Sequence, residues 1–285
     1  MDYISCTLCP RECGVDREAG ELGYCGAPAA ALVAKTMLHI WEEPVLAGSG
    51  GSGAIFFGGC TLGCRYCQNR EISARPVGVP TDSVQLRRMM EELIAQGAEN
   101  IDLVTPTHYL PTILPALEKK LPVPGVYNCG GYERVQTLKA LEGKVDIYLP
   151  DLKYADDALA LQRSGAKDYF AGATAAIREM GRQTGSVVWE GDKVTRGVIV
   201  RHLILPGHIE NSLKVLDWLG ENFAPGEILV SLMRQYPPMG GMEPPFDRRV
   251  TDEEYDAVLS WMLLNDLEGF TQDAEAAEQE FIPDF

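Results

Sequence analysis

Short apolar runs alternate with amphipathic stretches along most of this chain, from about residue 53 to residue 233. Apolar runs of four to eight residues are typical of buried strands, whereas apolar residues spaced three and four apart are typical of helices that cover a sheet. We expect strands at 54–57, 101–104, 123–128, 145–149, 198–205 and 228–233. We expect helices at 81–97, 110–120, 132–141, 156–182 and 209–221. Six such units in regular order predict an α/β fold, with a parallel sheet and helices outside it.

The two ends of the chain do not follow this pattern. Residues 1–48 are rich in cysteine, glycine and proline and hold too little apolar material to form a core, so a metal would have to organise them. Beyond the last strand, the pattern predicts one amphipathic helix at 252–264, followed by an acidic tail. The aromatic residues at 281–285 suggest that this tail docks. We therefore divide the chain into a cysteine-rich segment (1–48), a central α/β unit (49–250) and a C-terminal helix with its tail (251–285).

Charge and hydropathy narrow the function classes. The chain has 285 residues, 25 basic and 41 acidic, and a formal net charge of −16. Such an excess of negative charge disfavours binding to nucleic acid or to an anionic membrane. No apolar run is long enough to span a bilayer, and the N-terminus lacks the basic and apolar regions of a signal peptide. These features predict a cytoplasmic protein with no nucleic-acid or membrane partner.

The densest chemical signal is a loop with three cysteines. Cys60, Cys64 and Cys67 follow the first central strand with the spacing C-x3-C-x2-C. Three thiolates on one loop can bind three irons of a [4Fe–4S] cluster and leave the fourth iron open, whereas an electron-transfer cluster normally has four thiolates. A zinc knuckle would show paired C-x2-C units and four ligands. The spacing therefore predicts a catalytic [4Fe–4S] cluster on this loop.

A second group of cysteines lies in the first segment. Cys6, Cys9, Cys13 and Cys25 have the spacing C-x2-C-x3-C-x11-C. Four thiolates can bind a structural zinc ion tetrahedrally or a second [4Fe–4S] cluster, and the spacing does not decide between them. Because no secretory signal accompanies these cysteines, we interpret them as metal ligands in a reducing compartment rather than as disulfides.

The arrangement C-x3-C-x-aromatic-C after a strand, with Tyr66 in the aromatic position, resembles the signature of the radical S-adenosylmethionine (radical SAM) superfamily. The resemblance implies a partial (β/α)6 TIM-like barrel, here with a small N-terminal metal-binding segment. It also implies that SAM chelates the open iron and that the reduced cluster cleaves SAM to methionine and a 5′-deoxyadenosyl radical. A reductant protein such as flavodoxin or ferredoxin would supply the electron.

Polar residues follow the predicted strands, at the end where barrel enzymes carry their active sites. A zwitterionic cofactor needs donors for its carboxylate, acceptors for its amine and partners for its ribose. The candidates for these contacts, together with Tyr66, are Thr107, Asn128, Asp151, Lys153 and Arg201. Arg201 and His202 are neighbours in a strand and must point to opposite faces; we expect Arg201 to face the interior.

Two further strand-end residues keep alternative interpretations. His108 is either a proton shuttle or a helix-capping residue. Cys129 is either a small buried thiol or, less simply, a radical relay or auxiliary ligand.

A narrower resemblance covers most of residues 50–240. The segment Asp151-Leu152-Lys153 is similar to the D-x-K motif of the enzymes that activate glycyl-radical enzymes, the pyruvate formate-lyase activating type. Arg201 with the downstream Pro206-Gly207, and the ending Cys67-Gln68-Asn69, also resemble that type. The resemblance implies hydrogen abstraction from a glycine of a glycyl-radical enzyme.

Two segments depart from that type. Residues 105–108 replace its Gly-Gly-Glu, and residues 235–238 replace its histidine. A small-molecule or other peptide substrate therefore remains an alternative, as does a non-catalytic iron–sulfur or zinc protein.

Overall fold

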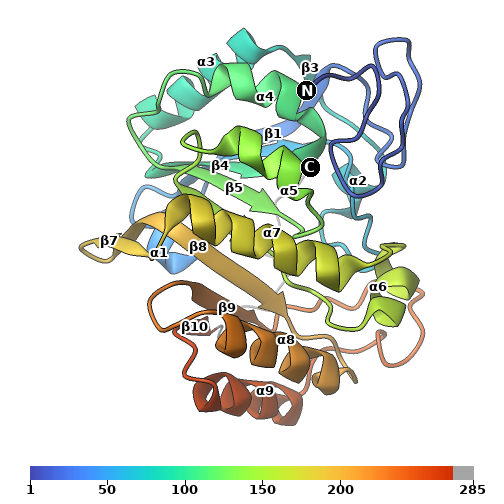
Figure 1. Ribbon diagram of the computed structural model, residues 1–285, viewed down its shortest axis with the longest axis vertical. Coiled ribbons are helices and arrows are strands. Elements are labelled where there is room, and N and C mark those ends of the chain that lie inside the picture. Colours follow the sequence, from blue (N-terminus) through green and yellow to red (C-terminus); the bar gives the residue numbers. More distant parts are fainter. Residues whose placement is uncertain (272–285) are drawn as a thin grey trace.

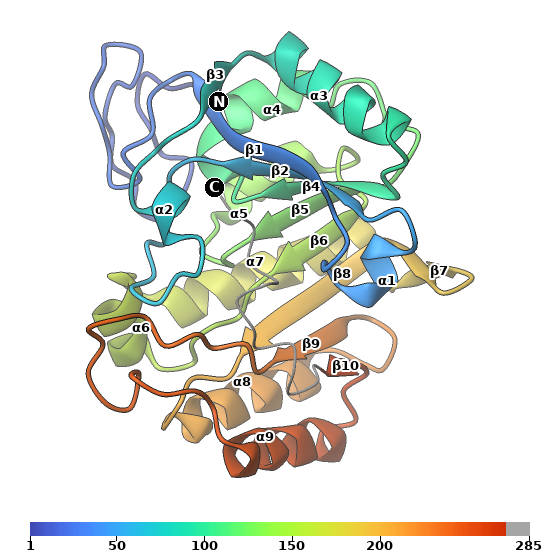
Figure 2. The ribbon, with the colours of Figure 1, turned by 180° about the vertical axis from the view of Figure 1, so that it is seen from behind.

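The computed structural model, which describes residues 1–271, is built around one open, twisted sheet (Figure 1 and Figure 2). Its strands lie in the order β10-β9-β8-β6-β5-β4-β2-β1-β3, with β7 paired to β8. The strands are β1 (Ala31–His39), β2 (Ser52–Phe57), β3 (Val79–Thr81), β4 (Asn100–Val104), β5 (Gly125–Cys129), β6 (Ile147–Pro150), β7 (Val188–Glu190), β8 (Lys193–Leu203), β9 (Leu229–Met233) and β10 (Gly269–Thr271). The predicted docking of residues 281–285 lies outside the described residues.

The predicted parallel strands are confirmed. β2, β4, β5, β6, β8 and β9 are neighbours in chain order, and each pair is parallel. The sheet does not close on itself, which agrees with the partial barrel that the family resemblance implies. Before this parallel set, the apolar runs at 31–34 and 37–41 predict two short strands, and the chain forms one continuous strand there, β1. Although it belongs to the cysteine-rich part of the sequence, it joins the central sheet antiparallel to both β2 and β3.

Helices cover one face of the sheet. In Figure 1, α4, α5, α7 and α8 lie in front of the strands, and in Figure 2 the opposite face of the sheet is turned to the viewer. The helices are α1 (Pro44–Ala47), α2 (Arg70–Ser73), α3 (Ser83–Ala95), α4 (Leu110–Ala116), α5 (Val135–Leu138), α6 (Asp157–Ser164), α7 (Tyr169–Thr184), α8 (Ile209–Asn222) and α9 (Asp252–Leu264), with 3-10 turns η1 (Thr107–Tyr109) and η2 (Lys139–Leu141).

The helical region predicted over 156–182 consists of two helices. The chain forms α6 and α7, because Gly165 adopts a left-handed conformation (φ 57°) that ends α6. This break places Ser164, the last residue of α6, next to the cysteine loop, since its hydroxyl reaches Cys64.

The strands have two different faces. Side chains that point toward the helices form the main apolar core, for example Tyr127 and Val200. On the other face, apolar residues lie near the beginning of each strand and pack on Leu46 of α1, as Val126 and Ile199 do. Two residues further on, the same face becomes polar. Because side chains alternate along a strand, Asn128 follows Val126 and Arg201 follows Ile199 on this inner face, near the carboxyl ends.

Residues 1–30 form turns that lie beside the carboxyl ends of the strands (Figure 1). They have only a very small apolar cluster of their own, centred on Tyr3, Cys6 and Leu8. Arg17 ties the segment to the barrel, because its guanidinium donates to the His108 carbonyl (2.6 Å) and lies over the Tyr3 ring. Within residues 1–271, none of the helices is long and apolar enough to cross a membrane.

Candidate functional site

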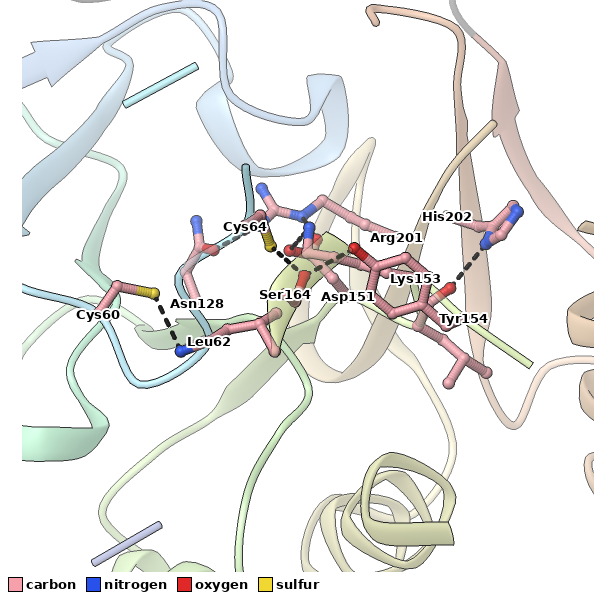
Figure 3. Close-up of polar contacts among 12 residues, drawn as sticks. Cys60, Leu62, Cys64, Asn128, Asp151, Lys153, Tyr154, Ser164, Arg201 and His202 are labelled. Carbon is pink, nitrogen blue, oxygen red and sulfur yellow. Dashed lines mark hydrogen bonds and ion pairs between the residues drawn. The ribbon is translucent and has the colours of Figure 1, made fainter. Parts of the chain in front are cut away.

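The three cysteines lie on the loop that leaves the carboxyl end of β2. Two glycines with positive φ, Gly59 (87°) and Gly63 (69°), let this loop turn sharply. Cys60, Cys64 and Cys67 are half-buried. The backbone N–H of Leu62 donates to the Cys60 sulfur (3.4 Å), and the Ser164 hydroxyl donates to the Cys64 sulfur (3.1 Å), as Figure 3 shows.

This donor set fits a [4Fe–4S] cluster. No group of three cysteine, histidine or carboxylate side chains in residues 1–271 could hold a single metal ion as it stands. A cluster does not require the three sulfurs to surround one ion, since each thiolate binds a different iron. Burial raises the pKa of Cys60 to about 12, and it also raises the pKa of Cys64, whereas the charge of Lys153 lowers the latter. Hydrogen bonds to the sulfurs and a nearby cation favour the thiolate that an iron ligand must be.

A charged network lies on the inner face of the sheet beside this loop (Figure 3). Asp151, directly after β6, accepts from Lys153 Nζ (2.6 Å) and from Arg201 Nε (2.9 Å). The second arm of Arg201 donates to the Asn128 side-chain oxygen (2.5 Å). Four of the predicted cofactor-binding residues, from β5, β8 and the β6–α6 loop, are thus in one hydrogen-bonded group.

The electrostatics of this network keep Asp151 ionised. Burial by itself would raise the pKa of Asp151, but Arg201 and Lys153 outweigh it, and the pKa lies below the usual range. Burial would likewise lower the pKa of Lys153, yet Asp151 and the Cys64 sulfur raise it. The site therefore offers a fixed carboxylate acceptor between two cations, which are the groups that a zwitterionic ligand needs.

Further carboxyl groups lie deeper on the same face, and the sequence interpretation missed them. Asp102 of β4 accepts from the Asn128 side-chain nitrogen (3.1 Å), and Glu42 lies 3.6 Å from Arg201. Burial, and next the neighbouring Glu42, raise the pKa of Asp102 well above its usual range. Asp102 could have been identified from the sequence, because it is a charged residue inside an apolar strand. Glu42 could not, because its position near the site depends on the turn after β1.

Tyr66 and Thr107 have other contacts. The buried Tyr66 hydroxyl is hydrogen-bonded to that of Tyr154 (2.5 Å), which in turn is bonded to Ser164 (2.7 Å). Thr107 donates to Glu133 (2.6 Å) and accepts from Tyr127 (3.2 Å). Tyr66, which belongs to the cysteine loop, is therefore linked through Tyr154 to Ser164. The Thr107 hydroxyl instead forms hydrogen bonds with Glu133 and Tyr127.

The histidines near the site are neutral and structural. His202 points away from Arg201, as strand alternation requires, and bonds the Leu152 carbonyl (2.6 Å) and Ser212 (2.8 Å). His108 bonds the Gly58 carbonyl (2.9 Å). Burial lowers the pKa of each to about 4. His108 thus holds the loop after β2 rather than capping a helix. Cys129 is fully buried on β5.

The four N-terminal cysteines lie close enough to influence one another. Burial is the main cause that raises the pKa of Cys9 to about 12; the backbone N–H of Arg11 opposes it, and Glu133, Cys25 and Cys13 add smaller effects in the same direction as burial. The Tyr24 N–H donates to the Cys13 sulfur (3.4 Å). Backbone N–H groups directed at cysteine sulfurs suit a thiolate–metal site. Metal binding by these four cysteines stays a prediction, with zinc and a second cluster both open.

Glu133 gives a pH-dependent prediction. Its carboxyl is fully buried with Thr107 and Tyr127, and burial raises its pKa to about 7 from 4.5, despite those hydrogen bonds. Between these values the folded protein keeps a proton that the unfolded chain releases, so this contribution to stability falls as pH rises from about 4.5 to 7. We expect the free energy of unfolding of the wild type to fall by about 3 kcal/mol over this range from Glu133 alone, at about 1.4 kcal/mol per pH unit. Glu133→Gln should lack this fall, because glutamine does not titrate.

Urea unfolding of wild type and Glu133→Gln at pH 5, 6, 7 and 8 measures this effect. Glu142→Gln, at an exposed position, is the control and should follow the wild-type pH profile. Parallel profiles for wild type and Glu133→Gln would contradict the assignment.

The arrangement of strands around a cysteine loop defines the fold as that of radical SAM enzymes, and comparison with solved structures bears this out. SuiB of Streptococcus suis, solved bound to S-adenosylmethionine, superposes with a TM-score of 0.53 at 14% identity, over 78% of this chain and 50% of its own. A radical SAM methyltransferase from Sphaerobacter thermophilus superposes with a TM-score of 0.52 at 14% identity, over 77% of this chain and 64% of its own. This chain spans about half the length of SuiB.

Comparisons of sequence match the cysteine loop to a family model and most of the chain to one relative. Residues 46–110, which contain Cys60, Cys64 and Cys67, match the family model of a 4Fe-4S single cluster domain. This match indicates a [4Fe–4S] cluster as a cofactor. An uncharacterized protein of Methanocaldococcus jannaschii is 29% identical over 271 residues, covering 90% of this chain and 74% of its own length.

Proposed function

We propose that this protein is a radical SAM enzyme, in which Cys60, Cys64 and Cys67 bind three irons of a [4Fe–4S] cluster. The observation that carries the proposal is that Cys64 of this loop lies beside the hydrogen-bonded Asp151–Lys153–Arg201–Asn128 network at the carboxyl ends of the strands (Figure 3). When bound and reduced, the cluster would supply the electron that cleaves SAM, so that hydrogen can be abstracted from a substrate.

The residues of the network have distinct roles in this proposal. Asp151 is ionised and accepts hydrogen bonds from the amine or the ribose of SAM. Lys153 lies within electrostatic range of Cys64 and donates to the SAM carboxylate. Arg201 holds Asp151 and Asn128 in place. Tyr66 contributes through the buried side of the loop, and Thr107 acts only indirectly, through Glu133.

The finer assignment is hydrogen abstraction from a glycine of a glycyl-radical enzyme, with flavodoxin or ferredoxin as the reductant and a cytoplasmic location. Its support is the Asp151-Leu152-Lys153 motif together with Arg201 and its downstream Pro206-Gly207. A small-molecule substrate is the second candidate, because residues 105–108 and 235–238 differ from the activating enzymes. In either case Cys6, Cys9, Cys13 and Cys25 bind zinc or a second cluster.

Formation of 5′-deoxyadenosine tests the proposed function. Anaerobically reconstituted protein is incubated with SAM and dithionite, beside the variant in which Cys60, Cys64 and Cys67 are all alanine. We expect 5′-deoxyadenosine from the wild type only. If wild type with an assembled cluster forms none, EPR spectra with and without SAM decide. A SAM-dependent change would mean that cleavage requires the substrate, whereas identical spectra would overturn the proposal.

EPR also distinguishes the substrate classes. Incubation with SAM, reductant and a candidate glycyl-radical enzyme should give the doublet signal of a protein glycyl radical. Consumption of a metabolite without that signal would favour the small-molecule alternative.

A further inference from the structure

Arg11 links the N-terminal cysteine segment to the cysteine loop of the proposed cluster. It lies between Cys9 and Cys13, but its side chain leaves that segment and donates to backbone carbonyl oxygens elsewhere. The acceptors are Thr61 (3.0 Å from Nε), Leu62 (3.1 Å from Nη2), Ser164 (2.9 Å from Nη2) and Gly165 (from Nη1). One guanidinium thus contacts two chain segments that are about a hundred residues apart in the sequence.

The first of those segments is part of the cluster loop, and the second contacts it. Thr61 and Leu62 lie between Cys60 and Cys64, and the N–H of Leu62 donates to the Cys60 sulfur. Ser164 and Gly165 end α6, and the Ser164 hydroxyl donates to the Cys64 sulfur (Figure 3). Arg11 therefore fixes the spacing between the loop and the end of α6, on which the hydrogen bond to Cys64 depends.

The geometry of the contact requires arginine. The planar guanidinium carries five N–H donors in a rigid fork, whereas lysine has a single point of charge. Tyr24 covers the guanidinium, with its ring centre 3.6 Å away, and the Tyr24 hydroxyl reaches the Leu62 and Ser164 carbonyls (3.4 and 3.3 Å). The partners are carbonyl oxygens rather than carboxylates, so the contact positions backbone and does not neutralise a charge.

The same two residues also touch the N-terminal cysteines. The backbone N–H of Arg11 is directed at the Cys9 sulfur, and the backbone N–H of Tyr24 donates to the Cys13 sulfur (3.4 Å). Because residues 1–30 have almost no apolar core of their own, a metal bound to these cysteines would hold the Arg11 backbone still. A still backbone would in turn fix the guanidinium on the cluster loop.

We propose that Arg11 is a positioning residue that couples the two cysteine sites, so that metal binding by Cys6, Cys9, Cys13 and Cys25 sets the reduction potential and the retention of the cluster at Cys60, Cys64 and Cys67. The coupling runs through the loop carbonyls and through Ser164. Hydrogen bonds to cluster sulfurs set the reduction potential, and partners around the ligands set affinity. This inference rests on the proposed function.

The test uses full-length, anaerobically reconstituted protein and two readouts besides activity. The first is the midpoint potential of the SAM-responsive cluster, from EPR-monitored redox titration. The second is the rate at which an iron chelator removes that cluster. We expect Arg11→Ala and Ser164→Ala each to shift the midpoint potential to more negative values. We expect Arg11→Ala to lose iron about tenfold faster, within the range seen when residues that support metal ligands are removed.

Two comparisons separate positioning from simple loss of structure. Arg11→Lys keeps the charge but not the fork, and should resemble Arg11→Ala. The double variant Arg11→Ala/Ser164→Ala should shift the potential no further than the larger single change, because both act on one contact.

The coupling itself is tested by Cys13→Ala, which damages the N-terminal site without touching the cluster loop. It should shift the potential and speed iron loss as Arg11→Ala does, with no added effect in the double variant. Arg134→Ala is the matched control. Arg134 also holds the N-terminal segment, because it donates to the Thr7 carbonyl (2.5 Å) and pairs with Glu12 (2.9 Å). Neither of these contacts involves the cluster loop. It should leave the potential unchanged.

The outcomes are distinguishable. Wild type that assembles no SAM-responsive cluster would overturn the proposed function and this inference with it. A wild-type cluster with an unchanged potential and unchanged iron loss in Arg11→Ala would overturn the inference alone. A shift in Arg134→Ala equal to that in Arg11→Ala would show that docking of the segment, rather than Arg11, controls the cluster. A shift in Arg11→Ala but none in Cys13→Ala would overturn the coupling to the N-terminal site.

Discussion

Replacing Cys60, Cys64 or Cys67 by alanine is expected to abolish assembly of the [4Fe–4S] cluster at that loop, and with it the formation of 5′-deoxyadenosine. Each thiolate binds a different iron, so no remaining cysteine of the loop can take over the position that is lost. Cys129 is too deeply buried on β5 to replace it. Each variant should contain about four fewer irons and four fewer sulfides per chain than the wild type.

Iron and sulfide assays, the visible absorption spectrum and product analysis measure this effect. Cys129→Ala is the matched control, since it removes a thiol that lies near the same strand ends but outside the loop. We expect this variant to keep the wild-type iron content. SAM cleavage retained by any one of the three loop variants would count against the assignment of that cysteine.

Asp151→Asn is expected to destabilise the fold and to weaken SAM binding. The change keeps the shape of the side chain but removes the negative charge between Arg201 and Lys153, whose side chains are only 17% and 14% exposed. Removing one partner of a buried ion pair leaves the other charge uncompensated, which typically costs about 3–5 kcal/mol. Because two cations lose their common partner here, we expect a loss at that level. The ionised acceptor proposed for SAM disappears with it.

Urea unfolding and equilibrium dialysis with labelled SAM measure the two effects separately. Asp146→Asn is the control, because Asp146 pairs with a lysine, Lys120, that is 75% exposed. Exposed pairs are typically worth less than about 1 kcal/mol. The double variant Asp151→Asn/Lys153→Met should recover part of the stability, since it removes one of the stranded cations. An unchanged affinity of Asp151→Asn for SAM would remove Asp151 from the proposed site.

The alternation of apolar runs and amphipathic stretches was sufficient for the parallel strands and for the position of the cysteine loop. These features depend on periods of two and of 3.6 residues, which are local properties of the chain. The alternation also required Arg201 and His202 to point to opposite faces of the sheet, and Arg201 lies on the inner face, as we expected. Residue spacing likewise identified the candidate cofactor from Cys60, Cys64 and Cys67, because three cysteines on one short loop must lie close together in any fold.

Contacts between distant segments could not be predicted in this way. Glu42, in the turn after β1, lies 3.6 Å from Arg201 of β8, although the two residues are far apart in the sequence. Ser164 reaches Cys64 because Gly165 ends α6 at that point, and this end was hidden inside a continuous helical pattern. Thr107 had the right chemistry and the right position after a strand, yet its hydroxyl points to Glu133.

The sequence by itself determined the six parallel strands in chain order, the helical segments between them and the position of the cysteine loop, because these depend on neighbours along the chain. The tertiary structure alone decided which charges are paired, which carboxyl groups keep a proton and which distant side chains hold the loop. The physical reason is that desolvation, ion pairing and hydrogen bonding depend on distances across the fold, and local periodicity carries no information about those distances.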